Sequence, residues 1–428
     1  MLKKNSLLVL ILILWACGGG DKCEQYLDNP SAPVSIDFTD RTHEIHEIAS
    51  QDEMETYFAA NPIIRDYFFE YGDLPSEASF HSQVLRFVTT PKVQDIFGAP
   101  DVATLEELLE KNRDIRDLLA IPYLSAKPGR SLYDLHDLLK SSTITSLNSL
   151  ERIGLYLDKY PEEREMMALA FNFITKEELD EENFETLKNP YVDTLYQEVF
   201  QLIDGGQLRF DLDRAYARVK EHFSFFNAPK IEMIYSGFGR DIFISDSLLV
   251  IGIDYYLGEE ASFRPNVYDY LKARLTPEHL VPQIMQFTSL QFNSTKEDKR
   301  SLLEEMIYYG KALEFASEML PCTAPHLIMG FTPQQMANAE LSEAIIWNYF
   351  LDNKLIYSEN PNNVSRYISE RPSVPEIDKI CPGRIGQWVG WQIVKKYREE
   401  SDMSFEELMK ETNAQKILTQ SKYKPRLR

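Results

Sequence analysis

Histidine and carboxylate side chains are the first residues to consider for chemistry, because a catalytic zinc site needs three protein ligands and one open position. The usual helical pattern, His-Glu-x-x-His, places two imidazoles at i and i+4 with the Glu as general base. Only His43-Glu44-Ile45-His46-Glu47 comes near this pattern, and its two His are spaced i and i+3 in an alternating polar segment. We interpret this segment as a solvated face, and the remaining His are isolated in the sequence.

Other catalytic motifs are also missing from the sequence. The turn Ser236-Gly237-Phe238-Gly239 lacks the full pattern of a dinucleotide or phosphate loop, and the chain has no Gly-x-Ser-x-Gly nucleophile elbow. Three isolated polar residues remain as candidates for an active site of another kind: Asp254, Tyr309 and Glu314. Asp254 follows an apolar strand, so it is either a functional acid or a cap for the next turn, and we favour the cap.

The composition excludes one class of partner. The formal net charge is −22, and a strongly acidic chain repels phosphate backbones, which argues against nucleic acid. Hydrophobic residues make up 44% of the chain and aromatic residues 12%, which is ample for a packed core.

The N-terminus predicts export and a lipid anchor. Lys3 and Lys4 precede an apolar run, Leu7–Ala16, that is too short to span a bilayer, so residues 1–16 read as a signal peptide. The run ends in Leu14-Trp15-Ala16-Cys17, which resembles a bacterial lipobox and makes Cys17 the lipidation candidate. The alternative is an ordinary Cys after a plain secretory signal. Residues 17–36, with three Gly after Cys17, read as a flexible tether.

An exported chain lies in a compartment that permits disulfides. Cys322 and Cys381 each adjoin a Pro in a predicted interhelical loop, so we consider a Cys322–Cys381 disulfide, with two free thiols as the alternative. Cys23 falls in the tether.

Residues 37–188 read as a helical and weakly repetitive region. Similar phrases begin at Asn61, Asn112 and Tyr160, at a spacing typical of helical-hairpin repeats. The alternative is chance recurrence in an acidic helical segment.

Residues 189–428 read as a small sheet followed by a helical body, an α+β arrangement that is mostly α. A strand is predicted at 230–236 and a hairpin at 241–245 and 248–254. Helices are predicted at 277–292, 296–320, 333–353, 384–399, 404–411 and 414–421. Gly386 and Gly390 lie at i and i+4 beside Trp388 and Trp391, which indicates that another backbone packs closely on that helix.

Several motifs in this region carry a resemblance to a known family. They include Ala228-Pro-Lys-Ile-Glu-Met-Ile-Tyr-Ser-Gly237, Ala273-Arg-Leu-Thr-Pro-Glu-His-Leu-Val-Pro282 and Pro382-Gly-Arg-Ile-Gly-Gln-Trp-Val-Gly-Trp-Gln-Ile-Val394. From about residue 189 to the C-terminus the chain resembles the gliding motility-associated lipoprotein GldB family of Bacteroidota. The helical region before it looks expanded relative to that family.

The GldB family is similar to predicted zinc proteases with a zincin-like fold, a His-Glu-x-x-His helix and a following Glu-Gly-x-Ala helix. By this resemblance the first helix falls on Val281–Leu290, which holds no His or Glu, and Tyr309 stands where the third ligand should be. The resemblance therefore implies a degenerate, catalytically inactive zincin-like domain without catalytic residue, metal ligand or cofactor.

We therefore expect an outer-membrane lipoprotein that faces the periplasm and supports gliding motility and type IX secretion machinery as a non-catalytic interaction or assembly component. Its expected partners are the membrane, through the lipid anchor, and proteins of the motility or secretion apparatus. The alternatives are a metallopeptidase-like or other hydrolytic enzyme that reuses the cleft, and a peptide- or glycan-binding helical module.

Overall fold

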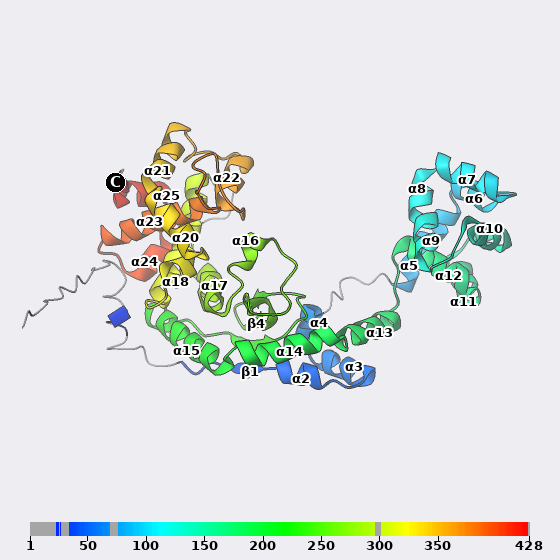
Figure 1. Ribbon diagram of the computed structural model, residues 1–428, viewed down its shortest axis with the longest axis horizontal. Coiled ribbons are helices and arrows are strands. Elements are labelled where there is room, and N and C mark those ends of the chain that lie inside the picture. Colours follow the sequence, from blue (N-terminus) through cyan, green and yellow to red (C-terminus); the bar gives the residue numbers. More distant parts are fainter. Residues whose placement is uncertain (1–22, 25, 27–33, 69–75, 296–300, 427–428) are drawn as a thin grey trace, which may run out of the picture. The chain divides into compact units, whose positions relative to one another are not determined.

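The computed structural model describes all residues except 1–22, 25, 27–33, 69–75, 296–300 and 427–428. The chain divides into two compact units, labelled by their elements in Figure 1. Unit 1 comprises Met1–Glu47 and Pro190–Arg428, and unit 2 comprises Ile48–Asn189. The predicted signal peptide and Cys17 lie outside the described residues.

Unit 2 is helical. Its elements are α3 (Gln51–Ala60), α4 (Pro62–Phe68), α5 (Glu77–Val88), α6 (Pro91–Phe97), α7 (Val102–Lys111), α8 (Arg113–Ile115), η1 (Arg116–Ala120), α9 (Ile121–Ala126), α10 (Leu132–Ser141), η2 (Ile144–Ser146), α11 (Leu150–Lys159), α12 (Pro161–Phe171) and α13 (Lys176–Leu187). Its helices from α5 to α12 enclose a hydrophobic cluster that runs from Phe80 to Phe173, whose rings stack with centroids 4.1 Å apart. Many of the helices begin at a Ser, Thr or Asp whose side chain accepts a backbone N–H, which stabilises the first turn.

The three similar phrases of unit 2 share one local geometry. Each begins at the C-cap of a ten-residue helix (α3, α7 or α11), where the backbone leaves the helical region for one residue. In each, the N–H four residues further on donates to the carbonyl of the cap residue at 3.0 Å and starts the next helix: Arg65 to Asn61, Arg116 to Asn112 and Arg164 to Tyr160. The recurring element is therefore a kink between consecutive helices, and hairpin repeats remain a prediction.

Unit 1 contains a four-stranded mixed sheet in the order β1-β2-β4-β3, formed by β1 (Phe38–Asp40), β2 (Lys230–Ile234), β3 (Ile242–Ile244) and β4 (Leu248–Gly252). β3 and β4 are antiparallel, as the predicted hairpin requires, whereas β2 is parallel to both β4 and β1. The prediction that residues from 37 on belong to the helical region is wrong for residues 37–47, because β1 pairs Phe38 with Ile231.

The rest of unit 1 is helical, and all of its helices except α2, α14 and α15 follow the sheet along the chain, so the predicted α+β, mostly α class is confirmed at this level. Its helices are α2 (Thr42–Glu47), α14 (Pro190–Leu202), α15 (Gly205–His222), η3 (Ile253–Tyr256), α16 (Asp269–Lys272), α17 (Pro277–Thr288), η4 (Ser289–Gln291), α18 (Leu302–Met319), α19 (Pro325–Met329), α20 (Pro333–Leu341), α21 (Glu343–Asp352), α22 (Pro361–Ile368), α23 (Ile385–Glu399), α24 (Phe405–Lys410) and α25 (Ala414–Ser421). The single helix predicted at 333–353 is two helices that meet at Ser342.

Two glycines bring the backbones of α18 and α23 into contact. A Cβ built on Gly390 would lie 1.8 Å from the carbonyl oxygen of Met306, and one on Gly310 would lie 2.4 Å from the carbonyl carbon of Gly390. A Cβ on Gly386 would meet Tyr367 and Ile368 of α22 at about 3 Å. The predicted close backbone approach at Gly386 and Gly390 is confirmed, and it fixes how Trp388 and Trp391 are presented.

The disulfide differs from the predicted one. Cys322 is bonded to Cys23, with their Cα atoms 4.7 Å apart, and Cys381 is a buried free thiol. The predicted Cys322–Cys381 bridge is therefore wrong. Cys381 is buried in its own loop, where its N–H donates to Asp378 and its carbonyl accepts from Val374, while Cys322 lies in the loop that follows α18.

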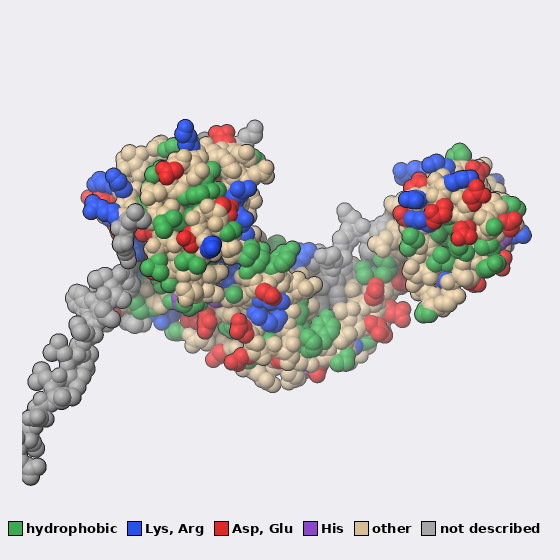
Figure 2. All heavy atoms as spheres, turned by 45° about the horizontal axis from the view of Figure 1, so that its top comes forward, with side chains coloured by type: hydrophobic (Ala, Val, Ile, Leu, Met, Phe, Trp, Pro, Cys, Tyr) green, Lys and Arg blue, Asp and Glu red, His purple; other side chains and the backbone are tan. Residues whose placement is uncertain are grey.

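No helix among the described residues is long and apolar enough to cross a membrane. On the face shown in Figure 2, Asp and Glu side chains are interspersed with Lys and Arg over both units. The visible face thus lacks the continuous basic stripe typical of nucleic-acid binding.

Candidate functional site

A groove of about 510 Å³ opens beside the glycine contact of α18 and α23. Trp388 and Trp391 of α23 contribute its aromatic lining, and Pro321 and Thr323 flank the disulfide at Cys322. Glu340 of α20 and Lys395 of α23 lie on its exposed side. A concave surface with aromatic side chains and a few polar groups suits binding of a ligand or a protein segment.

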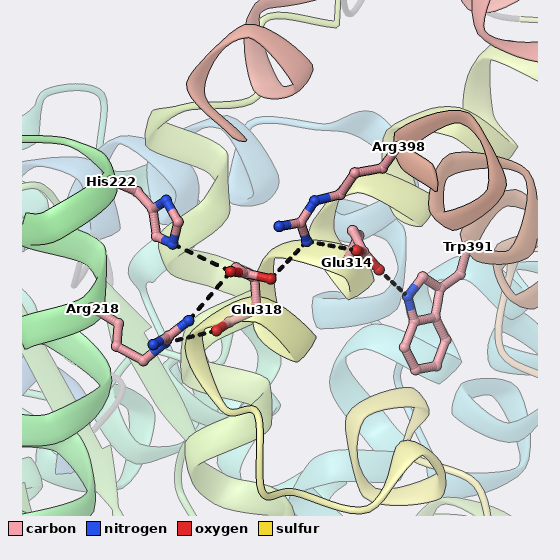
Figure 3. Close-up of polar contacts among 6 residues, drawn as sticks. All are labelled: Arg218, His222, Glu314, Glu318, Trp391 and Arg398. Carbon is pink, nitrogen blue, oxygen red and sulfur yellow. Dashed lines mark hydrogen bonds and ion pairs between the residues drawn. The ribbon is translucent and has the colours of Figure 1, made fainter. Parts of the chain in front are cut away.

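Six side chains form a chain of polar contacts (Figure 3), and three of them, Glu314, Trp391 and Arg398, line the groove. Trp391 Nε1 donates to Glu314 Oε2 at 2.9 Å, and Arg398 donates to Glu314 Oε1 at 3.0 Å and to Glu318 Oε2 at 2.6 Å. The other oxygen of Glu318 accepts from Arg218 of α15 at 3.2 Å and lies 3.4 Å from His222 Nε2. Both carboxylates therefore have a partner on each oxygen.

Burial and charge act against each other in this network. Burial alone would lower the pKa of Arg398, but the hydrogen bonds and negative charges of Glu318 and Glu314 outweigh it and raise that pKa. The side chains of Glu314 and Glu318 are only 5% and 9% exposed. Paired with the permanently charged guanidinium of Arg398, the two carboxylates hold the Arg398 and Trp391 side chains in place.

Asp254, the candidate acid at the end of β4, is a buried cap. Its Oδ1 accepts the N–H of Ser236 at 2.8 Å and its Oδ2 accepts the N–H of Phe238 at 2.7 Å. Burial raises its pKa to about 6. The capping interpretation is right, but the turn is the one after β2 and not the one that follows Asp254. Parallel pairing of Ile234 with Gly252 puts the ends of β2 and β4 at the same edge, which explains the difference.

Tyr309 lies elsewhere, in a depression of about 590 Å³ with Glu305, Pro361 and Ile368. The three candidate residues Asp254, Tyr309 and Glu314 thus occupy three separate environments. Tyr309 and Glu314 are five residues apart on α18, so they point to different sides of the helix.

Lys311 is a buried side chain that the sequence reasoning missed. Its Nζ donates to Thr295 Oγ1 at 3.3 Å and to the carbonyl of Met409 at 3.1 Å, and it also donates to the carbonyl of Glu411. Burial lowers its pKa to about 8. Because these carbonyls end α24, Lys311 acts as a C-cap supplied by another helix.

The histidines lie in different surroundings, and no group of three or more His, Cys, Asp or Glu among the described residues could hold a metal ion. His43 is 65% exposed beside Glu47, which agrees with a solvated face. His46 instead stacks on Tyr196, with ring centroids 3.6 Å apart. His279 of α17 is buried, its Nδ1 lies 2.8 Å from Thr276 Oγ1, and burial lowers its pKa to about 4.

Comparison with known protein families assigns the chain to one of them. The family model described as gliding motility protein GldB matches residues 136–425, which is well over half of the chain. The chain belongs to the GldB family. The GldB match begins inside unit 2, whereas the sequence motifs predicted a resemblance only from about residue 189. It includes the phrase at Tyr160 but not those at Asn61 and Asn112. No curated protein and no solved structure matches the chain.

Proposed function

We propose that this GldB protein is an outer-membrane lipoprotein, anchored through Cys17 and facing the periplasm, that supports gliding motility and the type IX secretion machinery. In this proposal it acts by binding partner proteins and not by catalysis. Support comes from the GldB match, the name of which indicates a role in gliding, and from the predicted signal peptide, residues 1–16, which is followed directly by Cys17.

The observation that carries the binding proposal is the groove with its paired carboxylates. Glu314 and Glu318 are held on both oxygens by Arg398, Arg218 and Trp391, which leaves an ordered and shaped wall. Such a fully satisfied polar network favours one conformation of the surrounding side chains. The Trp-lined groove beside it therefore suits recognition of a protein segment with little rearrangement.

An enzyme that reuses a former cleft is the competing proposal. It would need Asp254, Tyr309 and Glu314 to act together, and their contacts give it no support. Chelator-sensitive cleavage of peptides by the purified protein, with stoichiometric zinc, would contradict the non-catalytic proposal directly.

The binding proposal is tested with a charge reversal at the rim of the groove. In cells that lack the native copy, we expect Lys395→Glu to reduce colony spreading and the recovery of motility or secretion proteins with the tagged lipoprotein. Lys354→Glu, an exposed lysine outside the groove, is the matched control and should behave as the native chain does. If Lys395→Glu cells spread normally and the same proteins are recovered with the tagged lipoprotein, the groove is not the binding site.

A further inference from the structure

The segment just after the predicted lipidation residue is fixed to the body of unit 1 in two ways. The first is covalent, through the Cys23–Cys322 disulfide. The second is Tyr26, whose ring lies under Arg214 and Arg218 of α15, with Cζ atoms 4.5 and 5.0 Å from its centroid. We call the disulfide and the Tyr26 contacts together the clasp.

The contacts of Tyr26 are those of a built docking site. Its side chain is only 8% exposed, and its hydroxyl accepts a hydrogen bond from Arg214 Nε at 2.7 Å. Cation–π contacts of this kind contribute about 0.5–1 kcal/mol at exposed sites and more when desolvated. Tyr26 would therefore stay docked after the disulfide alone is removed.

The clasp sets how far the body can move from the lipid. Only five residues lie between Cys17 and Cys23, so the chain takes six residue steps from one to the other. Even fully extended they reach about 20 Å. Among the residues described after Tyr26, Ile36 is buried and its N–H donates to Asp213 at 3.2 Å, so Ile36 serves as the next attachment point when the clasp is absent. The nineteen residue steps from Cys17 to Ile36 would reach about 65 Å.

The clasp also lies on the same side of unit 1 as the groove. Cys322 lies between Pro321 and Thr323, and both of these residues line the groove. Arg218, which covers Tyr26, donates to Glu318 of the charged network along the groove. The clasp and the groove are thus neighbouring parts of one surface.

We propose that the clasp holds the groove against the lipid surface, so that GldB takes its partner at the membrane–water boundary. This inference rests on the proposed lipid anchor at Cys17, and it deepens the proposed function by placing the groove. The partner is then a protein segment that itself lies at the lipid surface, such as the juxtamembrane part of a membrane protein. A segment confined to the open periplasm would not suit a groove held so close to the bilayer.

The groove carries its own reporter of this distance. Trp388 and Trp391 line it, and energy transfer from them to dansyl-labelled phospholipid reports their proximity to the bilayer. The lipidated protein is reconstituted in phosphatidylethanolamine–phosphatidylglycerol vesicles, and Trp347→Phe removes the remaining tryptophan of the mature chain.

Two variants lengthen the effective tether. Inserting ten Gly and Ser residues after Gly20 keeps the clasp but extends the reach from Cys17 to about 55 Å. The triple variant Cys23→Ser, Cys322→Ser, Tyr26→Ala removes the clasp. We expect transfer to fall about twofold or more in each, while Cys381→Ser, which removes a cysteine outside the clasp, leaves it unchanged.

Equal transfer from the native chain and the insertion variant would overturn the inference, and that variant decides the matter if the triple variant does not fold. Failure of the anchor itself is measured separately. Cys17→Ser should abolish vesicle binding of the native chain and of each variant. Binding that survives this change would contradict the lipid-anchor proposal, whereas equal transfer from the insertion variant contradicts the role of the clasp.

Discussion

The two units differ in how far apart along the chain their stabilising partners lie. Unit 2 is one continuous segment, and several of its helices begin at a Ser, Thr or Asp whose side chain caps the first turn. Unit 1 is joined by distant partners: Phe38 pairs with Ile231, and Cys23 bonds Cys322 across 299 residues. We infer that unit 2 is encoded by local signals, whereas unit 1 depends on long-range contacts that order late in folding.

The tryptophans make this comparison measurable. Trp347, Trp388 and Trp391 all belong to unit 1, and residues 48–189 contain no Trp. Tryptophan fluorescence therefore follows unfolding of unit 1 alone, while far-UV circular dichroism follows the helices of both units. The predictions below use the two signals together.

The largest effect is expected at the α18–α23 contact. Gly390→Val would place side-chain atoms where the carbonyl of Met306 already lies, and we expect unit 1 to lose more than about 4 kcal/mol of unfolding free energy. Unit 2 should keep its transition in circular dichroism. Gly205→Ala is the control, since its Cβ would meet only Met233 at 3.6 Å and should change little. Loss of both transitions with Gly390→Val would break the comparison.

The charged network should give the next largest effect. Arg398→Met leaves Glu314 and Glu318 buried without their shared guanidinium, which costs about 3 kcal/mol when a buried pair loses one partner. The tryptophan transition in urea should move to lower denaturant, and the emission of Trp391 should change because Glu314 is its hydrogen-bond partner. Arg398→Lys keeps the charge and should lose less. An unchanged urea midpoint in Arg398→Met would show that the network adds nothing to unit 1.

The pH dependence of unit 1 should carry the signature of Lys311. Its folded pKa of about 8 lies below the ordinary lysine pKa of 10.5, so the unfolded chain binds more protons between these values. Its contribution to stability is therefore full above 10.5 and is lost as pH falls through 8. Between pH 8 and 9.5 we expect unit 1 to gain about 1–2 kcal/mol. Lys311→Met should flatten this rise in tryptophan-monitored unfolding; an identical slope in the variant would exclude Lys311 as its source.

The smallest effect is expected at a helix cap of unit 2. Ser149 Oγ accepts the N–H of Arg152 and begins α11, so Ser149→Ala should cost unit 2 about 1 kcal/mol. Thr90 occupies the same position before α6 but makes no side-chain capping bond, so Thr90→Ala should cost less. Circular dichroism should register the difference while tryptophan fluorescence does not. Equal losses from the two changes would argue against local capping in unit 2.

The sequence was most informative where the signal is local. Periodicity placed the helices of the C-terminal half, Asp246 and Ser247 marked the turn of the hairpin, and the mid-helix pair Gly386 and Gly390 indicated the close backbone contact. Within the site, Glu314 was a candidate, but its partners Arg398 and Glu318 were not.

The features that the sequence did not predict correctly share a cause, because each depends on contacts between residues far apart in the chain. β1 has only three residues, too few for an alternating pattern to identify, and its partner lies beyond residue 229. Cysteine pairing depends on Cα distances that spacing does not reveal, so Cys23 was overlooked. Lys311 lies in an apolar helix, and its acceptors at Met409 and Glu411 belong to another element.

The points where unit 2 begins and ends adjoin one another. Lys188 Nζ donates to the carbonyl of Ile48, and on the unit 1 side His46 lies 3.7 Å from Asp193. A segment with adjacent ends can be lengthened or shortened without rerouting the chain around it. The length of unit 2 can therefore change without disturbing the pairing of β1 with β2, whose strands lie on either side of it in the sequence.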